Sequence, residues 1–307
     1  MEVEYPKIEI LMATYNGEKY IEEQIKSLFK QTYKNWTLLI RDDGSKDNTV
    51  GIIRKYEKEN PNRIKFLEDK KGGLKAKNNF LELLRNSQEE YVMFCDQDDI
   101  WLPNKIELTL KKMLEVEIGP TLIHTDLKVV DEKLKIISNS FWKFQNLDPN
   151  RKKYNHLIVQ NNITGCTMMV NKELIALCKE EFKNGIMHDW VIGIIASLKG
   201  KIEYIDTQTI LYRQHGKNDV GAKKYNLLYF LEKFINNRKE LKKNSSKSRE
   251  QIKEIALKLK LEIREEESIN EYISLENKKN IYRKFWLIKN GYLKTGVYRK
   301  IGQIFCE

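Results

Sequence analysis

Three aspartates directly follow an apolar stretch in the block YVMFCDQDDIW, which spans residues 91–101. Asp96, Asp98 and Asp99 fall within four positions, with no basic residue among them. Carboxylates this close repel one another and raise each other's pKa, so a cation is expected beside them. Aspartate oxygen is a hard ligand, which points to Mg²⁺ or Mn²⁺ shared with a phosphate. The alternative is that these aspartates form a solvated acidic turn before the next helix. The neighbouring motifs are needed to choose between the two interpretations.

Two further groups of small polar residues follow apolar stretches in the same way. The tetrapeptide TYNG at 14–17 ends the first apolar stretch, and DDGS at 42–45 follows the second. Asparagine, aspartate, glycine and serine favour turns, which would explain each group taken alone. Three such groups, each at the end of an apolar stretch, are better explained by one shared ligand site.

Alternating strand and helix patterns must position these groups. Such alternation is typical of βαβ units in a mostly parallel sheet, where ligands bind at the carboxyl ends of the strands. We expect strands at 7–14, 36–40, 63–67, 91–95 and 121–130, and helices at 18–30, 49–59, 75–84 and 104–116.

The rest of the chain is less regular. Residues 163–170 are apolar and predict a buried strand or turn, an apolar helix should open at His188, and a further strand is expected within 201–213. From residue 223 onward the sequence is lysine-rich and helix-prone, with a polar break predicted at 244–248.

Composition limits the class of protein. The 307 residues suffice for one large domain with an appendage, and no apolar run reaches the length of about 18 that spans a bilayer. No signal peptide is visible at the N-terminus, so we expect a cytoplasmic protein. The cysteines lack metal-ligand spacing and are interpreted as free thiols: Cys95, Cys166, Cys178 and Cys306. Of the net charge of +11, residues 223–307 carry +10, which suggests a tail that meets an anionic surface.

Six motifs, in this order, resemble the inverting glycosyltransferases of family 2: ILMATYNG, LLIRDDGSKDNT, FCDQDDIW, TGCTMMV, MHDW and LYRQH. The resemblance covers roughly residues 5–220 and is greatest to bacterial rhamnosyltransferases of cell-wall or capsular polysaccharides. It implies a GT-A fold, in which a Rossmann-like, mostly parallel α/β sheet is flanked by helices. The implied domains are a catalytic domain at 1–222, with a nucleotide-sugar half at about 1–100 and an acceptor half at about 101–222, and a basic helical C-terminal region at 223–307.

The resemblance also implies roles on the donor side. Thr14, Tyr15 and Asn16 would line the nucleotide. Asp43 would accept a hydrogen bond from the base N–H, and Asp96 would face the ribose or reach the metal through water.

Further roles concern the metal and the acceptor. Asp98 would bind Mn²⁺ or Mg²⁺ directly, with His215 as a second ligand, because neutral imidazole is a sound ligand for Mn²⁺. Asp189 would be the general base, since an acceptor hydroxyl is a poor nucleophile until a carboxylate removes its proton. His188 is a weaker candidate for that role. The alternatives are helix capping for Asp189 and a plain loop position for His215.

One position departs from the family pattern. The family often places a basic residue just before the asparagine of its third helix, near the phosphates. Here that position is Asn78, with Lys77 one residue earlier. The cation that contacts the phosphates therefore stays open.

Other classes of protein fit less well. A receiver domain needs its acids after strands one and three, and a sugar-nucleotide nucleotidyltransferase needs a basic glycine-rich loop after strand one. A non-catalytic glycan- or nucleotide-binding relative should lack Asp98 or Asp189, and both are present. The basic tail carries no nucleic-acid-binding motif.

These observations predict a metal-dependent inverting transferase that moves L-rhamnose from dTDP-L-rhamnose to a lipid-linked saccharide acceptor, with a UDP-hexose as the alternative donor. The basic tail would hold the protein on the anionic inner face of the plasma membrane. Packing on the catalytic domain and a homodimer contact are the alternatives. Two stretches of mixed basic and aromatic residues carry the membrane prediction, at 223–238 and 281–304.

Overall fold

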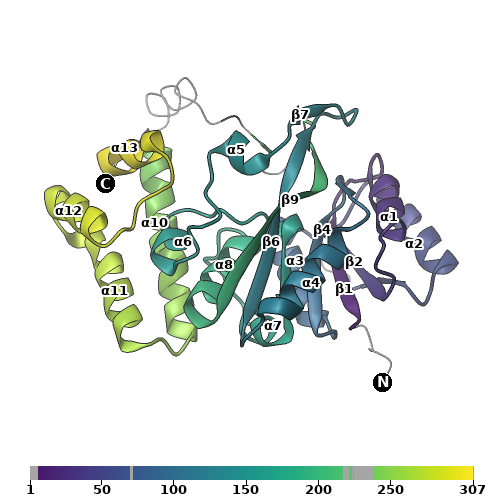
Figure 1. Cartoon of the computed structure of the whole chain (residues 1–307), viewed down its shortest axis with the longest axis horizontal. Helices are drawn as coiled ribbons and strands as arrows, with labels where there is room; N and C mark the ends of the chain where they lie inside the picture. Colours follow the sequence, from purple (N-terminus) through teal and green to yellow (C-terminus); the bar gives the residue numbers. More distant parts are fainter. Residues whose placement is uncertain (1–5, 70–71, 217–220, 223, 225–237, 307) are drawn as a thin grey trace.

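One nine-stranded sheet forms the centre of the structure, a computed structural model that describes residues 6–69, 72–216, 221–222, 224 and 238–306. The strand order is β3-β2-β1-β4-β8-β6-β9-β5, with β7 paired to β6 (Figure 1). The strands are β1 (Ile8–Thr14), β2 (Trp36–Asp42), β3 (Ile64–Phe66), β4 (Tyr91–Asp96), β5 (Ile100–Trp101), β6 (Thr121–Val130), β7 (Ile136–Ser138), β8 (Met169–Asn171) and β9 (Lys201–Arg213).

The strands of the N-terminal half are parallel and end at the same edge. β1 lies between β2 and β4, with Thr14 opposite Asp42 and Ala13 opposite Asp96. The loops that follow these strands therefore emerge side by side, as the alternation of strands and helices predicted.

The two-residue strand β5 is too short to be predicted from a sequence pattern. It pairs antiparallel with β9, at Ile210 and Leu211. β9 in turn runs parallel to β6. This pairing carries the end of β9, and the residues after it, to the acidic block that follows β4.

Helices cover both faces of the sheet. One buried apolar cluster includes residues of α1 (Ile21–Phe29), α2 (Thr49–Glu59) and α4 (Lys105–Val116). The other includes residues of α3 (Lys75–Asn86), α7 (Lys172–Cys178) and α8 (His188–Lys199). The shorter elements are α5 (Phe141–Gln145), α6 (Tyr154–Val159) and the 3₁₀ turn η1 (Gly165–Thr167), so the predicted strand or turn at 163–170 is a turn followed by β8.

The C-terminal helices pack against the part of the chain that contains the sheet, at the end of the molecule opposite α1 and α2 (Figure 1). They are α10 (Arg238–Lys258), α11 (Ile263–Ser274), α12 (Asn280–Lys289) and α13 (Val297–Cys306), with the 3₁₀ turn η2 (Leu275–Asn277) between α11 and α12. Ile252, Trp286 and Tyr292 are buried in the same apolar cluster as residues of α8. Packing of the tail on the rest of the chain, one of the roles left open for it, is thus observed.

The predicted break at 244–248 is wrong, because α10 continues through it. Ser248 is buried, and its hydroxyl donates to the carbonyl of Ile158. Ile252 and Ile255, one and two turns later, are also buried. Burial along this face outweighs the weak helix propensity of asparagine and serine.

Two expectations concern the tail and the membrane. Apart from residues 224 and 238, the predicted membrane stretch at 223–238 lies outside the described residues. In the part of the chain that is described, no helix combines the length and apolar character needed to cross a bilayer.

Candidate active site

Gln97 fixes the loop that follows β1. The Tyr15 N–H donates to Gln97 Oε1, and Gln97 Nε2 donates to the Tyr15 carbonyl, both at 3.0 Å. A Cβ on Gly17 would lie 2.1 Å from Gln97 Oε1, so any larger residue there would displace the Gln97 amide. The Tyr15 ring stays 55% exposed, where it can cover a ligand.

Thr14 and Asn16 shape this edge of the sheet. The buried Thr14 hydroxyl donates to Asp42 Oδ1 at 2.8 Å. Asn16 has a φ of 49°, and its N–H donates to Ser45 Oγ at 2.8 Å. Asn16 Oδ1 accepts the Lys46 N–H at 2.7 Å. These bonds tie the loop after β1 to the loop after β2 and bring the first two motifs together.

Asp43 is buried, and its carboxylate faces the start of α3. Its Oδ1 and Oδ2 accept the N–H groups of Leu74 and Lys75, each at 2.8 Å. Arg41 Nη1 lies 3.5 Å from Asp43 Oδ1, and Arg41 also binds the Asp69 carboxylate. Oδ1 already faces two donors, whereas Oδ2 has one and keeps a second lone pair with which Asp43 can accept from a nucleobase.

Asp98 and His215 meet although 117 positions separate them. Asp98 Oδ2 lies 2.7 Å from His215 Nε2, and both side chains keep some exposure. Tyr20 stacks on the imidazole with ring centroids 4.8 Å apart. The buried Arg213 sets this approach, because its Nε donates to the Asp98 carbonyl at 2.9 Å. A carboxylate oxygen and an imidazole nitrogen so close together suit a shared divalent ion such as Mn²⁺.

A second cluster of possible ligands lies beside this pair. One ligand atom from each of Asp96, Asp99 and Cys166 lies within 4.8 Å of the others. Burial, together with the charges of Asp98 and Asp96, holds the pKa of Asp99 well above its ordinary value. Burial likewise raises the pKa of the Cys166 thiol. Asp99 and Cys166 are fully enclosed, and a thiol is a soft donor that suits a hard cation poorly, so the partly exposed pair of Asp98 and His215 is the better metal candidate.

Asp189 lies in the first turn of α8. Its Oδ1 accepts the Trp190 N–H at 2.6 Å, and its Oδ2 accepts the Gly165 N–H at 3.1 Å. Asn161 adds a side-chain hydrogen bond. Burial raises the pKa of Asp189 to about 7, although these hydrogen bonds lower it. Met187, and not Asp189, occupies the N-cap position of α8, although Asp189 accepts one N–H of the first turn.

His188 is a packing residue. Its ring centroid lies 4.2 Å from that of Phe80 and 5.3 Å from that of Phe94. Among the described residues, neither ring nitrogen has a hydrogen-bond partner. Burial lowers the pKa of His188 to about 3, so the imidazole is neutral. Asp189 is therefore the better candidate for the base.

Lys77 does not supply the open phosphate contact. Its ammonium donates to the carbonyls of Phe182 and Lys183, at 3.0 and 2.9 Å. It ties α3 to the segment before α8.

Four residues at the site were missed by sequence reasoning: Arg41, Gln97, Asn161 and Arg213. Three of them stand inside the recognised motifs, which are the signal that could have drawn attention to them. Asn161 stands in no motif, and only its hydrogen bond to Asp189 reveals it. The cysteine prediction is confirmed for Cys95, Cys166 and Cys178, which are buried free thiols.

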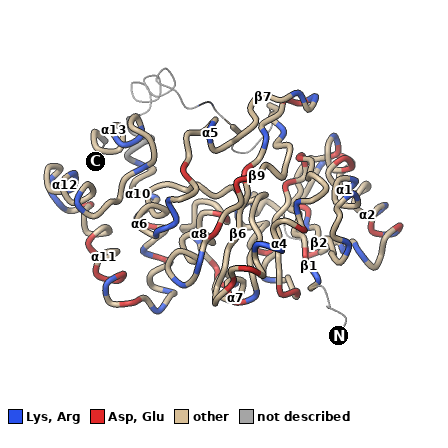
Figure 2. The backbone as a smooth tube through the Cα atoms, in the orientation of Figure 1, with Lys and Arg blue, Asp and Glu red and all other residues tan. Residues whose placement is uncertain are grey.

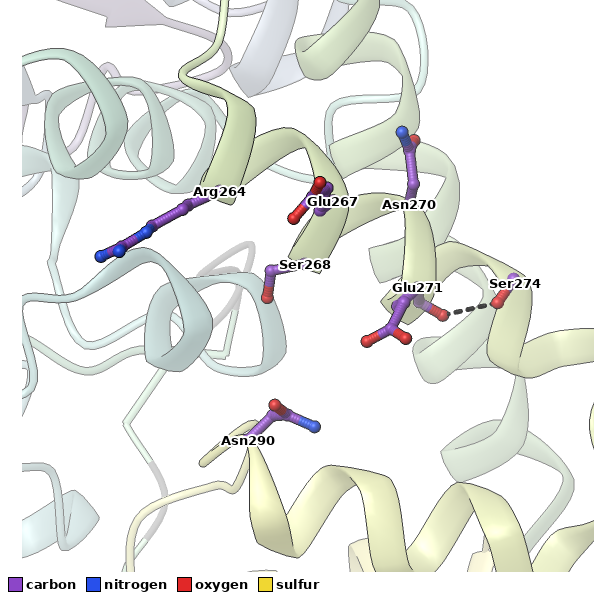
Figure 3. Close-up of a pocket in the computed structure, with 7 residues that line it drawn as sticks. All are labelled: Arg264, Glu267, Ser268, Asn270, Glu271, Ser274 and Asn290. Atoms are coloured by element: carbon purple, nitrogen blue, oxygen red, sulfur yellow. Dashed lines mark hydrogen bonds between the residues drawn. The ribbon is translucent and has the colours of Figure 1, made fainter.

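One cavity in the described chain lies away from this edge. It measures about 640 Å³ and lies on α11 near the end of α12 (Figure 3). Arg264, Glu267, Glu271 and Asn290 are among the residues that line it. None of them belongs to the six motifs.

Comparison with known proteins assigns the family. The model of glycosyl transferase family 2 matches residues 9–175, more than half of the chain. The dTDP-rhamnosyl transferase RfbG of Shigella flexneri is 31% identical over 230 residues, which is 69% of this chain and 74% of that protein. The UDP-Glc:alpha-D-GlcNAc-diphosphoundecaprenol beta-1,3-glucosyltransferase WfgD of Escherichia coli is 31% identical over 170 residues, 55% of this chain and 61% of that protein.

Solved structures agree on the architecture. S. aureus TarS 1-349 in complex with UDP-GlcNAc superposes with a TM-score of 0.57 at 16% identity, over 98% of this chain and 90% of that one. The mannosyltransferase PcManGT from Pyrobaculum calidifontis, in complex with GDP-Man and Mn²⁺, gives 0.56 at 13% identity, over 94% and 74%. The predicted GT-A fold with C-terminal helices is confirmed. With more than half of its length matched by the family model, the chain belongs to glycosyl transferase family 2.

Proposed function

We propose that this glycosyltransferase moves a sugar with inversion, in a metal-dependent reaction, to a lipid-linked saccharide in bacterial surface polysaccharide biosynthesis. The observation that carries the proposal is Asp189. It is a partly buried carboxylate with a pKa near 7, in the same molecule as the accessible pair of Asp98 and His215. A base that is partly ionised at neutral pH can activate a hydroxyl without being a strong base in water.

The proposed reaction is a single displacement. Asp189 takes the proton of the acceptor hydroxyl while that oxygen attacks the anomeric carbon of the donor. The bond from that carbon to the nucleoside diphosphate breaks on the opposite face, so the configuration inverts. No covalent sugar–enzyme bond forms, and His188 stays neutral throughout.

The donor would lie along the carboxyl ends of β1, β2 and β4. Tyr15 would cover the base, Asp43 would accept its N–H, and Asp96 would face the ribose. Thr14 and Asn16 would act by holding the loops in place, as their hydrogen bonds to the loop after β2 suggest.

A divalent ion belongs to the proposed donor site. Asp98 and His215 would hold Mn²⁺ or Mg²⁺, whose charge opposes the negative charge that grows on the leaving diphosphate. The choice of this pair rests on its oxygen and nitrogen donors and on its accessibility.

The sugar is proposed as L-rhamnose from dTDP-L-rhamnose, supported by the motif resemblance and by the name of the S. flexneri relative. The E. coli relative is named for a UDP-Glc donor and a diphosphoundecaprenol-linked acceptor. A UDP-hexose donor is accordingly the alternative, and the second name supports a lipid-linked acceptor.

Donor hydrolysis by the purified full chain tests the proposal. The panel is dTDP-rhamnose, UDP-glucose, UDP-galactose and UDP-N-acetylhexosamines, each with Mn²⁺, with Mg²⁺ and with EDTA. We expect dTDP-rhamnose to be cleaved fastest, with no cleavage in EDTA. Faster cleavage of a UDP-hexose would make that sugar nucleotide the proposed donor in place of dTDP-rhamnose. Full activity in EDTA would show that the reaction needs no metal.

We also propose that α12 and α13 rest on an anionic cytoplasmic membrane surface. Residues 280–306 contain six Lys or Arg and no acid. Large apolar side chains on these helices are exposed: Ile281, Tyr282, Phe285, Ile288, Val297, Ile301 and Phe305. Basic residues beside exposed apolar ones suit a helix that lies in a membrane interface. Of the aromatic residues predicted for this contact, Trp286 and Tyr292 are instead buried and anchor the helices.

A further inference from the structure

A smaller cavity, of about 330 Å³, lies where the C-terminal helices meet α6 and α8. Its polar lining consists of three cations and three amides: Lys247, Lys294, Arg299, Gln160, Asn161 and Asn244. No acidic side chain of the described chain lines it. The larger cavity differs, because Glu267 and Glu271 line it. Figure 2 shows basic positions along α13 and near α6, in the same part of the molecule.

The walls of this cationic cavity are held by hydrogen bonds. Arg299 Nη1 and Nη2 donate to the carbonyls of Asn146 and Gln145, at 2.7 and 2.6 Å. Gln160 Oε1 accepts the Thr295 N–H at 2.6 Å. These bonds join α13 and the loop before it to the ends of α5 and α6. Arg299 therefore occupies a place set by the fold.

The cationic cavity shares a wall with Asp189. Asn161 lines the cavity and also donates a side-chain hydrogen bond to Asp189. Trp190 lines it too, and its N–H donates to Asp189 Oδ1 at 2.6 Å. The Trp190 indole is fixed by its Nε1–H, which donates to the Leu157 carbonyl at 2.5 Å. An anion bound in the cavity would thus lie next to the proposed base.

We propose that the cationic cavity binds the diphosphate group through which the acceptor saccharide is joined to its lipid. Lysine, arginine and amide N–H groups are the donors that phosphate oxygens require. With the diphosphate held there, the attached sugar extends along Asn161 and Trp190 and reaches Asp189. This assignment deepens the proposed function and rests on its lipid-linked acceptor. An anionic sugar in the glycan is the other source of negative charge, and the test separates the two.

Calorimetric binding of inorganic diphosphate to the full chain tests the assignment. EDTA is present, so that no divalent ion can bridge the anion to Asp98. The double variant Lys247→Gln, Lys294→Gln removes two cavity charges. Its matched control, Lys253→Gln with Lys260→Gln, removes two exposed lysines of the C-terminal region that do not line the cavity. Thermal unfolding of both variants shows whether they fold like the native chain.

We expect the cavity variant to bind diphosphate at least about tenfold more weakly, since it loses two charge-assisted contacts, and the control to stay within about twofold. Farnesyl diphosphate should compete with inorganic diphosphate, whereas glucuronate should not. No binding by the native chain, equal weakening in both variants, or better competition by glucuronate would overturn the assignment. Donor hydrolysis is measured on the same proteins. It tests the proposed transferase activity separately, because this binding needs neither metal nor donor.

Discussion

At the scale of single residues, burial moves two neighbouring groups in opposite directions. It raises the pKa of Asp189 to about 7 and lowers that of His188 to about 3, because a low-dielectric surrounding favours the neutral form of each group. Of these two groups, only Asp189 changes its charge near neutral pH. The assignment of the base therefore follows from the environment rather than from the intrinsic basicity of imidazole.

The first prediction concerns Asp189→Asn. The variant should bind donor like the native chain, while kcat falls by about 10²–10⁴, the usual contribution of a positioned base. The kcat/KM of the native enzyme should rise as the pH rises through about 7, because only the ionised carboxylate accepts a proton. Steady-state kinetics from pH 5 to 9 measure kcat and kcat/KM, and donor titrations measure the donor affinity. A near-normal kcat in this variant would contradict the assignment.

The same pKa predicts a pH dependence of stability. The folded-state pKa of Asp189, about 7, lies above the ordinary value of 3.8, so the folded chain binds more protons between these values. The contribution of Asp189 to the free energy of unfolding should therefore fall as the pH rises through this window, and level off above it. Denaturant unfolding of the native chain and of Asp189→Asn measures it. The native chain should lose stability relative to the variant; a constant difference between them would refute the raised pKa.

A third prediction concerns the metal pair. Asp98→Ala should weaken Mn²⁺ binding, measured by electron paramagnetic resonance, and abolish transfer, because one of two ligands is lost. Glu90→Gln, which removes an exposed acid before β4, is the matched control and should change neither. Unchanged Mn²⁺ binding in Asp98→Ala would move the site to Asp96 and its neighbours.

At the scale of elements, the periodic spacing of apolar residues predicted the strands and helices that are set by which of their own residues are buried. The strands β1, β2 and β4 and the opening of α8 at His188 lie where the patterns placed them. The contacts of Asp43 with the start of α3, and of Arg213 with the loop after β4, were not predictable. They join segments that are distant in sequence and depend on strand register. α10 shows the opposite case, in which tertiary burial overrides an unfavourable local composition.

A fourth prediction tests how Gln97 holds the loop that follows β1. Gly17→Ala should lower the free energy of unfolding by about 1 kcal/mol, the usual net contribution of a hydrogen bond, because the new Cβ displaces the Gln97 amide from its bonds to the Tyr15 backbone. In a Gln97→Ala background the same change should cost much less, because the obstructing atoms are gone. A double-mutant cycle by denaturant unfolding measures this coupling. Equal costs in both backgrounds would mean that Gln97 does not set the need for glycine.

At the scale of the whole molecule, the C-terminal helices serve two surfaces at once. Their buried side chains, Trp286 among them, join the core of the catalytic part. Their lysines and Arg299 close the cationic cavity beside Asp189. Several of their other apolar side chains are exposed, Phe285 and Ile301 among them. The helices lie at the end of the molecule opposite α1 and α2 (Figure 1). Packing and membrane contact are thus compatible roles, carried by different faces of the same helices.

The last prediction tests the outward face. The full chain should sediment with vesicles that contain phosphatidylglycerol at low salt and be released at high salt, since each engaged basic residue contributes about 1 kcal/mol. Replacing Phe285, Ile288 and Ile301 by asparagine should reduce the bound fraction several-fold. The matched control replaces three exposed apolar residues elsewhere by asparagine: Leu114, Ile118 and Ile136. Equal loss in both variants, or no sedimentation of the native chain, would leave α12 and α13 as packing elements. A selective loss would place the membrane contact on α12 and α13, next to the loop whose Lys294 lines the cationic cavity.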